Sequence, residues 1–249
     1  MVIALGRVLV LVLLIAVWTV VADHMPKGLF ASPLETLHAA RTMLAEGRLF
    51  HAIFSSLRVY LTGTGLAAVI GIAIGVAMGA APRFGRVLDV FVYALAATPR
   101  VAFIPLIIVL LGLGLQAKVF IVFLGAVMPI ILNSYAGVRA TDRDLIEMAR
   151  ASGASPGRIF AHVVLPGAVP FLVTGLRIGA TIGLINTVVA ELYTAVSGLG
   201  GLLATYGASF RMAEYFVVVL TLSLIGVAVT EVLRHIENRL SRWSASAGR

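Results

Sequence analysis

Residues 147–166, EMARASGASPGRIFAHVVLP, form a polar interruption between two apolar runs that are each long enough to cross a bilayer. The interruption holds charged residues, two glycines and two prolines, and it lies between residues 118–138 and 167–192. A transmembrane helix needs about 20 predominantly apolar residues. A structured loop between two such runs indicates a polytopic membrane protein and raises the question of what the loop does.

The composition of the whole chain agrees with a membrane protein. Of its 249 residues, 60% are hydrophobic and 12% are charged, whereas soluble domains carry about a quarter of charged residues. A window of about 20 residues finds six candidate spans. They are residues 2–22, 57–81, 87–111, 118–138, 167–192 and 215–233. We therefore expect an all-α polytopic membrane protein with about six transmembrane helices.

The first apolar run has an alternative interpretation as a cleaved secretory signal, because Arg7 precedes an apolar stretch of suitable length. No small-x-small cleavage site follows cleanly, and residues 2–5 lengthen the run to a full span. We expect a retained helix. The chain has no cysteine, which excludes disulfides and thiolate metal sites.

Lysine and arginine residues predict the orientation of the chain. With a cytoplasmic amino terminus, the inner segments hold eleven of them and the outer segments hold six. Short inner loops are enriched in these residues, so both termini and residues 139–166 are expected in the cytoplasm. The net charge of +8 then follows from topology, and nucleic acid is not an expected partner.

Two features outside the loop predict helix packing. Within the outer segment, apolar residues recur at helical spacing and predict an amphipathic surface helix; they are Leu34, Leu37, Ala40, Met43 and Leu44. In the second span, small residues recur at every fourth position and predict close approach of another helix; they are Gly63, Ala67, Gly71, Gly75 and Gly79.

The third span contains Pro99 and Pro105 on either side of Arg100. Each proline removes a backbone donor and disfavours the helical turn before it, so a break is expected here. Broken backbone at membrane depth is tolerated beside protein or a water-filled cavity. We expect Arg100 to face that cavity as a counter-charge for an anion, with a structural carboxylate pair as the alternative. Pro129 and Pro170 are expected to act as milder kinks.

The fifth span carries further polar residues. Thr174, Arg177 and Thr181 form a stripe that we expect on the side of the translocation path, with snorkelling of Arg177 to the cytoplasmic interface as an equal alternative. Glu191 lies 14 residues after Arg177, about 21 Å along a helix, so the two side chains cannot pair directly. No phosphate-binding loop, HExxH or GxSxG motif occurs, and the histidines are scattered, so neither a catalytic nor a metal site is expected.

The loop itself predicts two short helices with a sharp bend. Thr141 and Asp144 are typical of a helix start, and Gly153 can take the left-handed conformation that ends a helix. Ser155 and Pro156 are typical of a second start. Each helix has an apolar face, which indicates either a docking surface or packing against the membrane domain.

The spacing of the loop resembles the EAA loop of ATP-binding cassette (ABC) importer permeases. Glu147, Ala149, Gly153, Val163, Leu165 and Pro166 match the pattern, and Met148 stands at its second position, where alanine is usual. The stretches TPRVAFIPL, TGLR and VVAEL resemble the nitrate, sulfonate and taurine branch of that family. The resemblance covers about residues 57–243.

The resemblance implies a type I permease of the MetI-like fold in a bacterial inner membrane. Residues 1–56 would form the first helix and an outer segment, residues 57–243 the permease domain, and residues 244–249 a cytoplasmic tail. Two permease copies, expected as a homodimer, would form the path, two ATPases would dock on the loop, and a binding protein would deliver a small anionic solute. The coupling residues would be Glu147, Ala149, Gly153, Ile159, Phe160, Val163, Leu165 and Pro166.

The resemblance also implies that ATP and magnesium bind the partner subunit and that this chain binds no cofactor. It favours a helix-positioning or gating role for Glu191. Path residues would be Arg100, Thr174, Arg177, Thr181 and Glu191. Alternative solutes are an aromatic acid or a pyrimidine precursor of thiamine. A self-contained secondary transporter or channel is a further alternative, but the sequence shows no inverted repeat and no run of ionisable residues for ion coupling.

Overall fold

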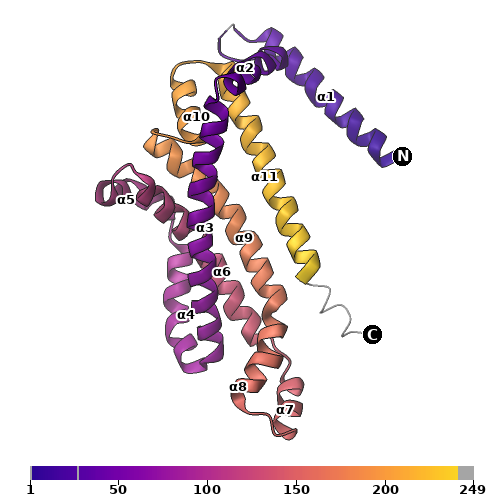
Figure 1. The fold of residues 1–249 in the computed structure, drawn as a ribbon, viewed down its shortest axis with the longest axis vertical. Helices are drawn as coiled ribbons and strands as arrows, with labels where there is room; N and C mark the ends of the chain where they lie inside the picture. The colour runs from indigo at the N-terminus through magenta and orange to yellow at the C-terminus, as the bar shows by residue number, and fades with distance from the viewer. Residues whose placement is uncertain (1, 27, 241–249) are drawn as a thin grey trace. The chain divides into compact units, whose positions relative to one another are not determined.

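The computed structural model describes residues 2–26 and 28–240, and over these residues the chain is helical and connected by short turns (Figure 1). Lys27, Arg242, Trp243, Arg249 and the expected tail 244–249 lie outside the described residues. The helices are α1 Val2–His24, α2 Pro33–Ala45, α3 Arg48–Ala80, α4 Pro82–Ala97, η1 Arg100–Phe103, α5 Ile104–Leu111, α6 Leu115–Arg139, α7 Arg143–Ala151, α8 Pro156–Ile159, η2 Phe160–Val164, α9 Leu165–Thr194, α10 Leu199–Ala208 and α11 Met212–Leu240.

Within the described residues, five helices are long and apolar enough to cross a membrane, and a bent pair makes a sixth candidate. The single helices are α1, α3, α6, α9 and α11, and the bent pair is α4 with the η1–α5 segment. The six apolar runs of the sequence thus correspond to six candidate spans among the described residues. α3 is longer than its run, because it begins at Arg48 and not near residue 57.

The chain divides into two compact units. The first unit comprises residues 1–57 and 191–225, and the second comprises residues 58–190 and 226–249. α3, α9 and α11 each contribute residues to both units.

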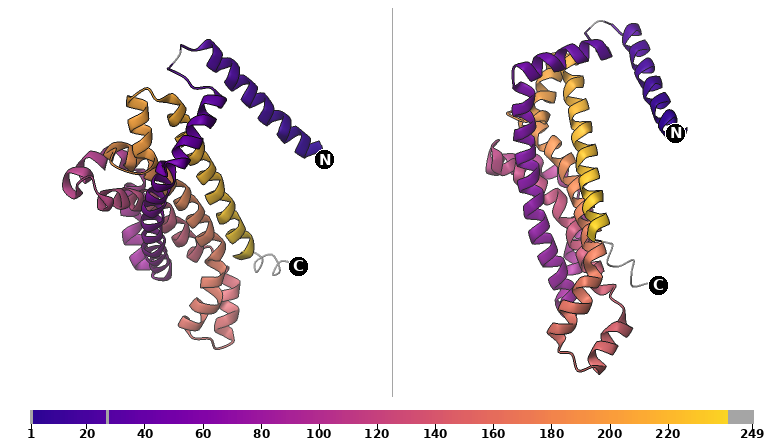
Figure 2. Two further views of the ribbon diagram at one scale, coloured as in Figure 1. Left: turned by 45° about the horizontal axis from the view of Figure 1, so that its top comes forward. Right: turned by 45° about the vertical axis from the view of Figure 1, so that its right-hand side comes forward.

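In the first unit, α1 is joined to α2 by a short connection, which both views of Figure 2 show. The indole nitrogen of Trp18 donates to the carbonyl of Ala31 at 2.9 Å. The Trp18 ring lies 5.5 Å from the ring of Phe216, measured between centroids, and Phe30 packs edge-on against the same ring. These aromatic contacts attach an otherwise exposed α1 to α11.

The predicted surface helix is α2. The Ser32 hydroxyl caps its amino end by accepting from the backbone N–H of Glu35. The Glu35 carboxylate accepts in turn from the backbone N–H of Ser32, which completes a capping box. Of the five apolar residues that predicted it, Met43 is fully buried, whereas Leu34, Leu37 and Leu44 are exposed. Only part of the apolar face of α2 is therefore buried within the first unit.

In the second unit, the small-residue stripe of α3 packs against α6, as the sequence predicts. A Cβ atom on Gly63 or Gly71 would come within 3.0 Å of the side chain of Val122 or Ile130. At Gly75 the same atom would lie 2.5 Å from the carbonyl oxygen of Ile131. Only small residues allow the two backbones to approach this closely.

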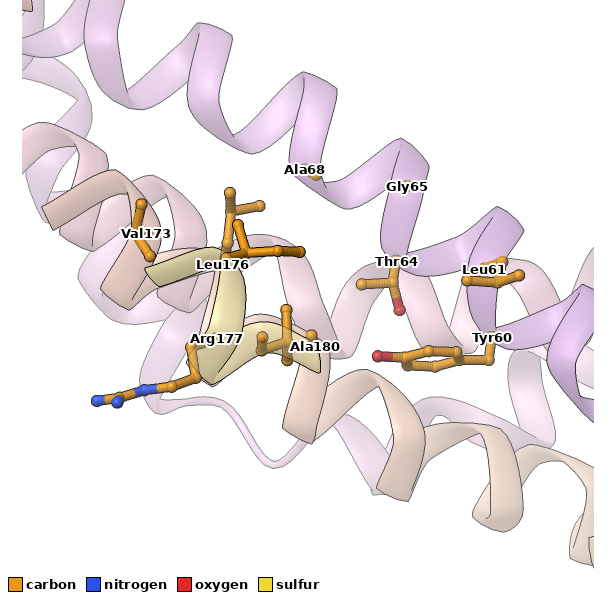
Figure 3. A pocket seen from close by; sticks show the side chains of 11 residues that line it. Tyr60, Leu61, Thr64, Gly65, Ala68, Val173, Leu176, Arg177 and Ala180 are labelled. Carbon is orange, nitrogen blue, oxygen red and sulfur yellow. The ribbon is translucent and has the colours of Figure 1, made fainter. Parts of the chain in front are cut away.

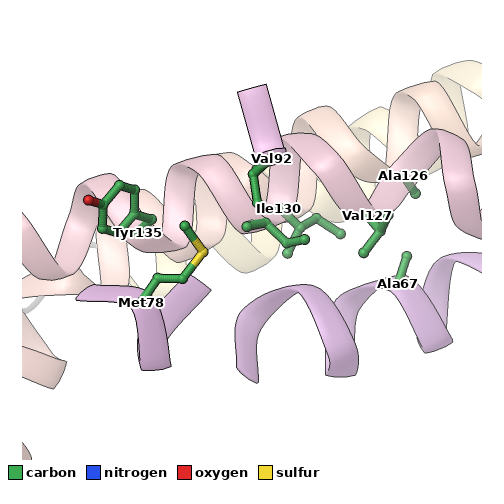
Figure 4. Close-up of a cluster of buried hydrophobic side chains, with 8 residues drawn as sticks. Ala67, Met78, Val92, Ala126, Val127, Ile130 and Tyr135 are labelled. Atoms are coloured by element: carbon green, nitrogen blue, oxygen red, sulfur yellow. The ribbon is translucent and has the colours of Figure 1, made fainter. Parts of the chain in front are cut away.

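The core of the second unit forms along this contact. Ala67 and Met78 of α3 and Val92 of α4 pack against α6 side chains (Figure 4); those from α6 are Ala126, Val127, Ile130, Ile131 and Tyr135. A second cluster joins α5 to α6 and to Ala190 of α9. α6 is thus the central helix of this unit. Pro129 lies inside α6 and Pro170 inside α9, and both helices continue through their prolines.

Candidate functional site

The loop that interrupts the apolar runs contains two helices that lie side by side at one end of α6 and α9 (Figure 1). α7 ends in a Schellman motif, in which the N–H of Ala154 donates to the carbonyl of Ala149 at 3.0 Å and that of Gly153 donates to Arg150 at 2.9 Å. Gly153 has a φ of +79°. The prediction that Gly153 ends the helix in the left-handed conformation is confirmed.

The start of α7 differs from the prediction. Asp142 is the capping residue, and its carboxylate accepts from the N–H of Asp144 at 2.9 Å. The Thr141 hydroxyl instead donates to the carbonyl of Val138, near the end of α6. The assignment of Thr141 as the cap was wrong, because its hydroxyl bonds to a carbonyl of the preceding helix and not to an amide of α7.

The second half of the loop is not a separate short helix, which corrects the prediction of two short helices. α8 begins after Ser155 with Pro156 at its first position, as predicted, but the Ser155 side chain makes no capping bond. One π-helical stretch, η2, then joins α8 to α9, so that residues 156–194 form a continuous helical segment. A displacement of α8 would therefore be transmitted directly along α9.

The apolar residues of the loop are partly packed against its own unit and partly exposed. Ile146, Ala149, Ala154, Phe160 and Val163 pack on a cluster that includes Val138 and Ile159. On the other face of α7, Leu145 and Met148 are 50% and 65% exposed. The loop is packed against its own unit on one side and presents an uncovered apolar face on the other.

The expected coupling residues divide in the same way. Glu147, Gly153, Leu165 and Pro166 are exposed, and Ala149, Phe160 and Val163 are half-buried. Ile159 is buried. The buried members hold the loop on its unit, whereas the exposed ones are accessible to a partner.

The third span is broken where the sequence predicts it. α4 ends at Ala97, and the pair formed by α4 and residues 100–111 bends by 80°. Arg100 opens the 3-10 turn at the break. Its guanidinium donates to the carbonyls of Gly125 at 2.8 Å, Leu124 at 3.3 Å and Ala96 at 3.2 Å. The guanidinium thus ties the break to α6 through neutral acceptors, and it forms no carboxylate pair among the described residues.

The polar residues of the fifth span are distributed along α9. The hydroxyls of Thr174 and Thr181 donate to carbonyls of their own helix, at Pro170 and Arg177. Arg177 lies at the edge of a crevice of about 270 Å³ between α3, α9 and α11. In Figure 3 its side chain points away from the crevice, whereas Tyr60 and Thr64 extend from α3 toward α9. Arg177 and Thr181 are both exposed.

Glu191 is fully buried in the first unit. Its Oε2 atom accepts from the Ser56 hydroxyl at 2.8 Å and from the backbone N–H of Gly200 at 2.9 Å. Ser56 Oγ in turn accepts from the backbone N–H of Leu199 at 2.8 Å. Glu191 and Ser56 therefore satisfy the first free amides of α10, which a capping side chain would otherwise do.

The sequence interpretation missed α10 and the role of Ser56. Gly198, immediately before α10, has a φ of +89°, and a Cβ atom there would overlap the Glu191 carboxylate. The signal in the sequence is the glycine-rich turn GLGG at residues 198–201 after an intramembrane acid. No cluster of metal-binding side chains occurs among the residues that the structure covers.

Residues 67–242 match the family model described as "Binding-protein-dependent transport system inner membrane component". A probable ABC transporter permease protein of Brucella abortus (strain 2308) is 34% identical over 86% of both chains. The putative aliphatic sulfonates transport permease protein SsuC of Escherichia coli (strain K12) is 33% identical over 93% of this chain and 89% of its own. The taurine transport system permease protein TauC of the same strain is 29% identical over 93% and 86%.

Solved structures have the same fold. The MetNI methionine ABC transporter in an inward-facing conformation aligns with a TM-score of 0.67 at 23% identity, over 77% of this chain and 95% of its own. The chain thus shares the overall helical fold of that structure. The family match covers most of the chain and includes the loop, so this chain belongs to the binding-protein-dependent inner membrane components and is a multi-pass permease subunit of an ABC importer.

Proposed function

We propose that this permease carries a small oxyanion of the aliphatic sulfonate and taurine class across the membrane. The relatives SsuC and TauC, which are named as sulfonate and taurine permeases and align over nearly the whole chain, carry this proposal. As in other ABC importers, an ATPase supplies the energy and a binding protein delivers the solute. We further propose that the complete transporter contains two ATPases and two copies of this chain, which surround one translocation path.

The exposed face of α7 is the proposed ATPase-docking surface. It consists of Leu145 and Met148, flanked by the exposed carboxylate of Glu147. Because α8 continues into α9, closure of the ATPases against α7 and α8 would move a membrane helix as one rigid element. The buried face of the loop keeps α7 and α8 together during that motion.

The orientation follows from the positive-inside rule. It assigns both termini and the α7–α8 loop to the cytoplasm, and the α2 and α10 segments to the outer side. A fluorescent or alkylating probe that does not cross membranes tests this assignment with single cysteines introduced by Ser152→Cys and Thr42→Cys, both at exposed positions. In intact cells or spheroplasts, only the Thr42→Cys variant should react.

Arg100 is the proposed positive charge of the anion path. A guanidinium has five N–H donors, and the bonds to three carbonyls leave Nε–H and one terminal N–H for a solute. Carbonyl acceptors carry no net charge, so the positive charge of Arg100 is stabilised by them without being neutralised. A charge at this depth costs about 3 kcal/mol or more without water or a partner, and the three carbonyls lower that cost.

Thr174, Arg177 and Thr181 are proposed to line the same path. The chain has no cysteine, so a single introduced cysteine is the sole thiol of the permease. The Thr181→Cys variant should react with a water-soluble thiol reagent in the assembled transporter. The Val109→Cys variant, whose site is exposed on the apolar α5, should not react, because lipid would surround it. Equal inertness of both would contradict the path assignment.

Reconstitution tests the function directly. The permease is purified with its ATPase, placed in proteoliposomes and supplied with its cognate binding protein. ATP-dependent uptake is measured for taurine, an alkylsulfonate, nitrate, an aromatic carboxylate and a pyrimidine. Uptake of the sulfonates supports the proposal. Uptake confined to the aromatic acid or the pyrimidine would contradict it, and ATP-independent uptake would contradict the ABC mechanism itself.

A further inference from the structure

A small basic cavity lies where α3 turns into α4, beside the end of α6, all within the second unit. Its volume is about 220 Å³, and it is lined by Met78, Gly79, Pro82, Arg86, Tyr135 and Arg139. None of these residues belongs to the α7–α8 loop or to the proposed path. The cavity therefore has no role in the function described above.

Tyr135 positions one of the two arginines. Its ring is buried, and the Arg139 guanidinium lies over it at 5.3 Å from the centroid. Arg139 Nη1 also donates to the Tyr135 hydroxyl at 3.1 Å. The hydroxyl acts there as the acceptor, so it keeps its own hydrogen for a further acceptor. The guanidinium is thus held by both a cation–π contact and a hydrogen bond.

Gly85 makes room for this arrangement. A Cβ atom on Gly85 would lie 3.1 Å from Tyr135 Cε2 and would overlap the carbonyl oxygen of Met78. The start of α4 can approach α3 and the tyrosine ring only because residue 85 has no side chain. The cavity is consequently a defined feature of the packing between α3, α4 and α6.

Among the described residues, Arg86 and Arg139 have no carboxylate partner. Arg86 donates from Nε to the carbonyl of Pro82 at 3.4 Å, and Arg139 bonds to Tyr135; neither forms an ion pair among the described residues. Two guanidinium groups that line one cavity repel each other, and an anion between them would remove that repulsion. Several of their N–H donors remain available to oxygen atoms.

We propose that this cavity binds the phosphate of an anionic phospholipid. Arginine forks match phosphate oxygens, and the volume corresponds to about seven water-sized groups at about 30 Å³ each. The cavity lies at the ends of apolar spans, where headgroups are found. Phe84 and Val87, exposed at 48% and 64% at the start of α4, provide apolar surface for the acyl chains. In the proposed orientation the lipid belongs to the cytoplasmic leaflet, which is anionic.

Basic residues are common at cytoplasmic helix ends, whatever they bind. Arg83 represents this general case, because it is exposed on the same turn and does not line the cavity. Arg86 and Arg139 are oriented by the cavity and by Tyr135, and we expect them to bind one lipid molecule together. We expect Arg83 to make no contribution to that binding.

The test is native mass spectrometry of the purified permease–ATPase complex titrated with phosphatidylglycerol or with phosphatidylcholine. We expect wild type to bind about one phosphatidylglycerol per permease chain and to prefer it to phosphatidylcholine. The double variant Arg86→Gln with Arg139→Gln should weaken that binding about tenfold or more. Arg83→Gln should stay within about twofold of wild type, and Tyr135→Phe should lie between these results.

Unchanged ATPase co-purification and thermal unfolding of the double variant show that it is folded, and an Arg86→Lys, Arg139→Lys variant should recover much of the affinity. The proposal is wrong if the double variant binds phosphatidylglycerol as wild type does, or if Arg83→Gln weakens binding equally. It is also wrong if inorganic phosphate at millimolar concentration binds the cavity while phosphatidylglycerol does not, because the ligand would then be a soluble anion.

Discussion

Ser56 and Glu191 lie 135 positions apart in the sequence and share a buried hydrogen bond of 2.8 Å. Together they bind the amino end of α10, since Ser56 accepts from Leu199 and Glu191 accepts from Gly200. An acid in a membrane span thereby acts as the cap of a neighbouring short helix. These hydrogen bonds are the contacts that a helix-positioning role of Glu191 would require.

Ser56→Ala should destabilise the complex. It removes one donor to the carboxylate and leaves the buried N–H of Leu199 without its acceptor, at a cost of about 1–3 kcal/mol. Thermal unfolding of the purified complex should shift to a lower temperature. Ser55→Ala is the matched control, because the hydrogen bond of Ser55 to Ser197 is long, at 3.4 Å, and exposed. Equal melting of both variants would contradict the capping role.

Gly153→Ala should weaken ATPase docking, whereas Gly157→Ala should not. Neither added methyl group meets another atom within 4 Å, but Gly153 has a φ of +79° and Gly157 lies within α8. A side chain in the left-handed conformation costs about 1–2 kcal/mol, which would displace α7 relative to α8. Co-purification of the ATPase and ATP-driven uptake measure the effect.

Met148→Glu should abolish docking by placing a charge on the exposed face of α7, while Met148→Leu should preserve it because it keeps that face apolar. Permease insertion is checked by membrane fractionation. If Met148→Glu still holds a full complement of ATPase, the docking surface lies elsewhere.

Gly75→Ala should destabilise the second unit, and Gly65→Ala on the same helix should be tolerated. The new Cβ atom at residue 75 would lie 2.5 Å from both the Ile131 carbonyl oxygen and Ser134 Cβ, whereas nothing lies within 4 Å at residue 65. Overpacking of this kind costs about 1–3 kcal/mol. Yield of the folded complex and its melting temperature report the difference. Comparable values for the two variants would mean that α3 can move away from α6 at little cost.

The sequence was most informative where one strong physical constraint applied. Long apolar runs predicted the spans, because backbone groups in lipid must be satisfied within a helix. Pro99 and Pro105 predicted the break, and the small residues of the second span predicted its packing face. The left-handed turn at Gly153 was predictable because few residues other than glycine adopt it.

The sequence was least informative where a choice depended on distant groups. Thr141 and Asp142 are both acceptable caps, and the carbonyl of Val138 decides between them. α10 escaped prediction because Ser56 and Glu191, far away in the sequence, satisfy its first amides. The partners of Arg100 were equally inaccessible, since backbone carbonyls leave no signature in a sequence.

Substitutions of Arg100 distinguish two possible roles of its side chain. As the counter-charge of the path it needs a positive charge, so Arg100→Lys should retain much of the uptake of a small anion and Arg100→Gln should lose most of it. As a clamp of the broken span it needs the fork that reaches the carbonyls of Ala96, Leu124 and Gly125. Lysine has neither the planar shape nor the spacing of that fork, so a clamp would fail in both variants.

Uptake and thermal unfolding should therefore be measured together for Arg100→Lys and Arg100→Gln in the reconstituted complex. The counter-charge role predicts similar melting temperatures, intact stimulation of ATPase activity by the binding protein, and uptake that follows the charge at residue 100. Arg83→Gln serves as the comparison, because it removes a charge from an exposed position on α4 that lies outside the proposed path. If both Arg100 variants melt at lower temperature and lose uptake equally, the guanidinium holds the break of the third span, and the anion must find its positive charge elsewhere in the path.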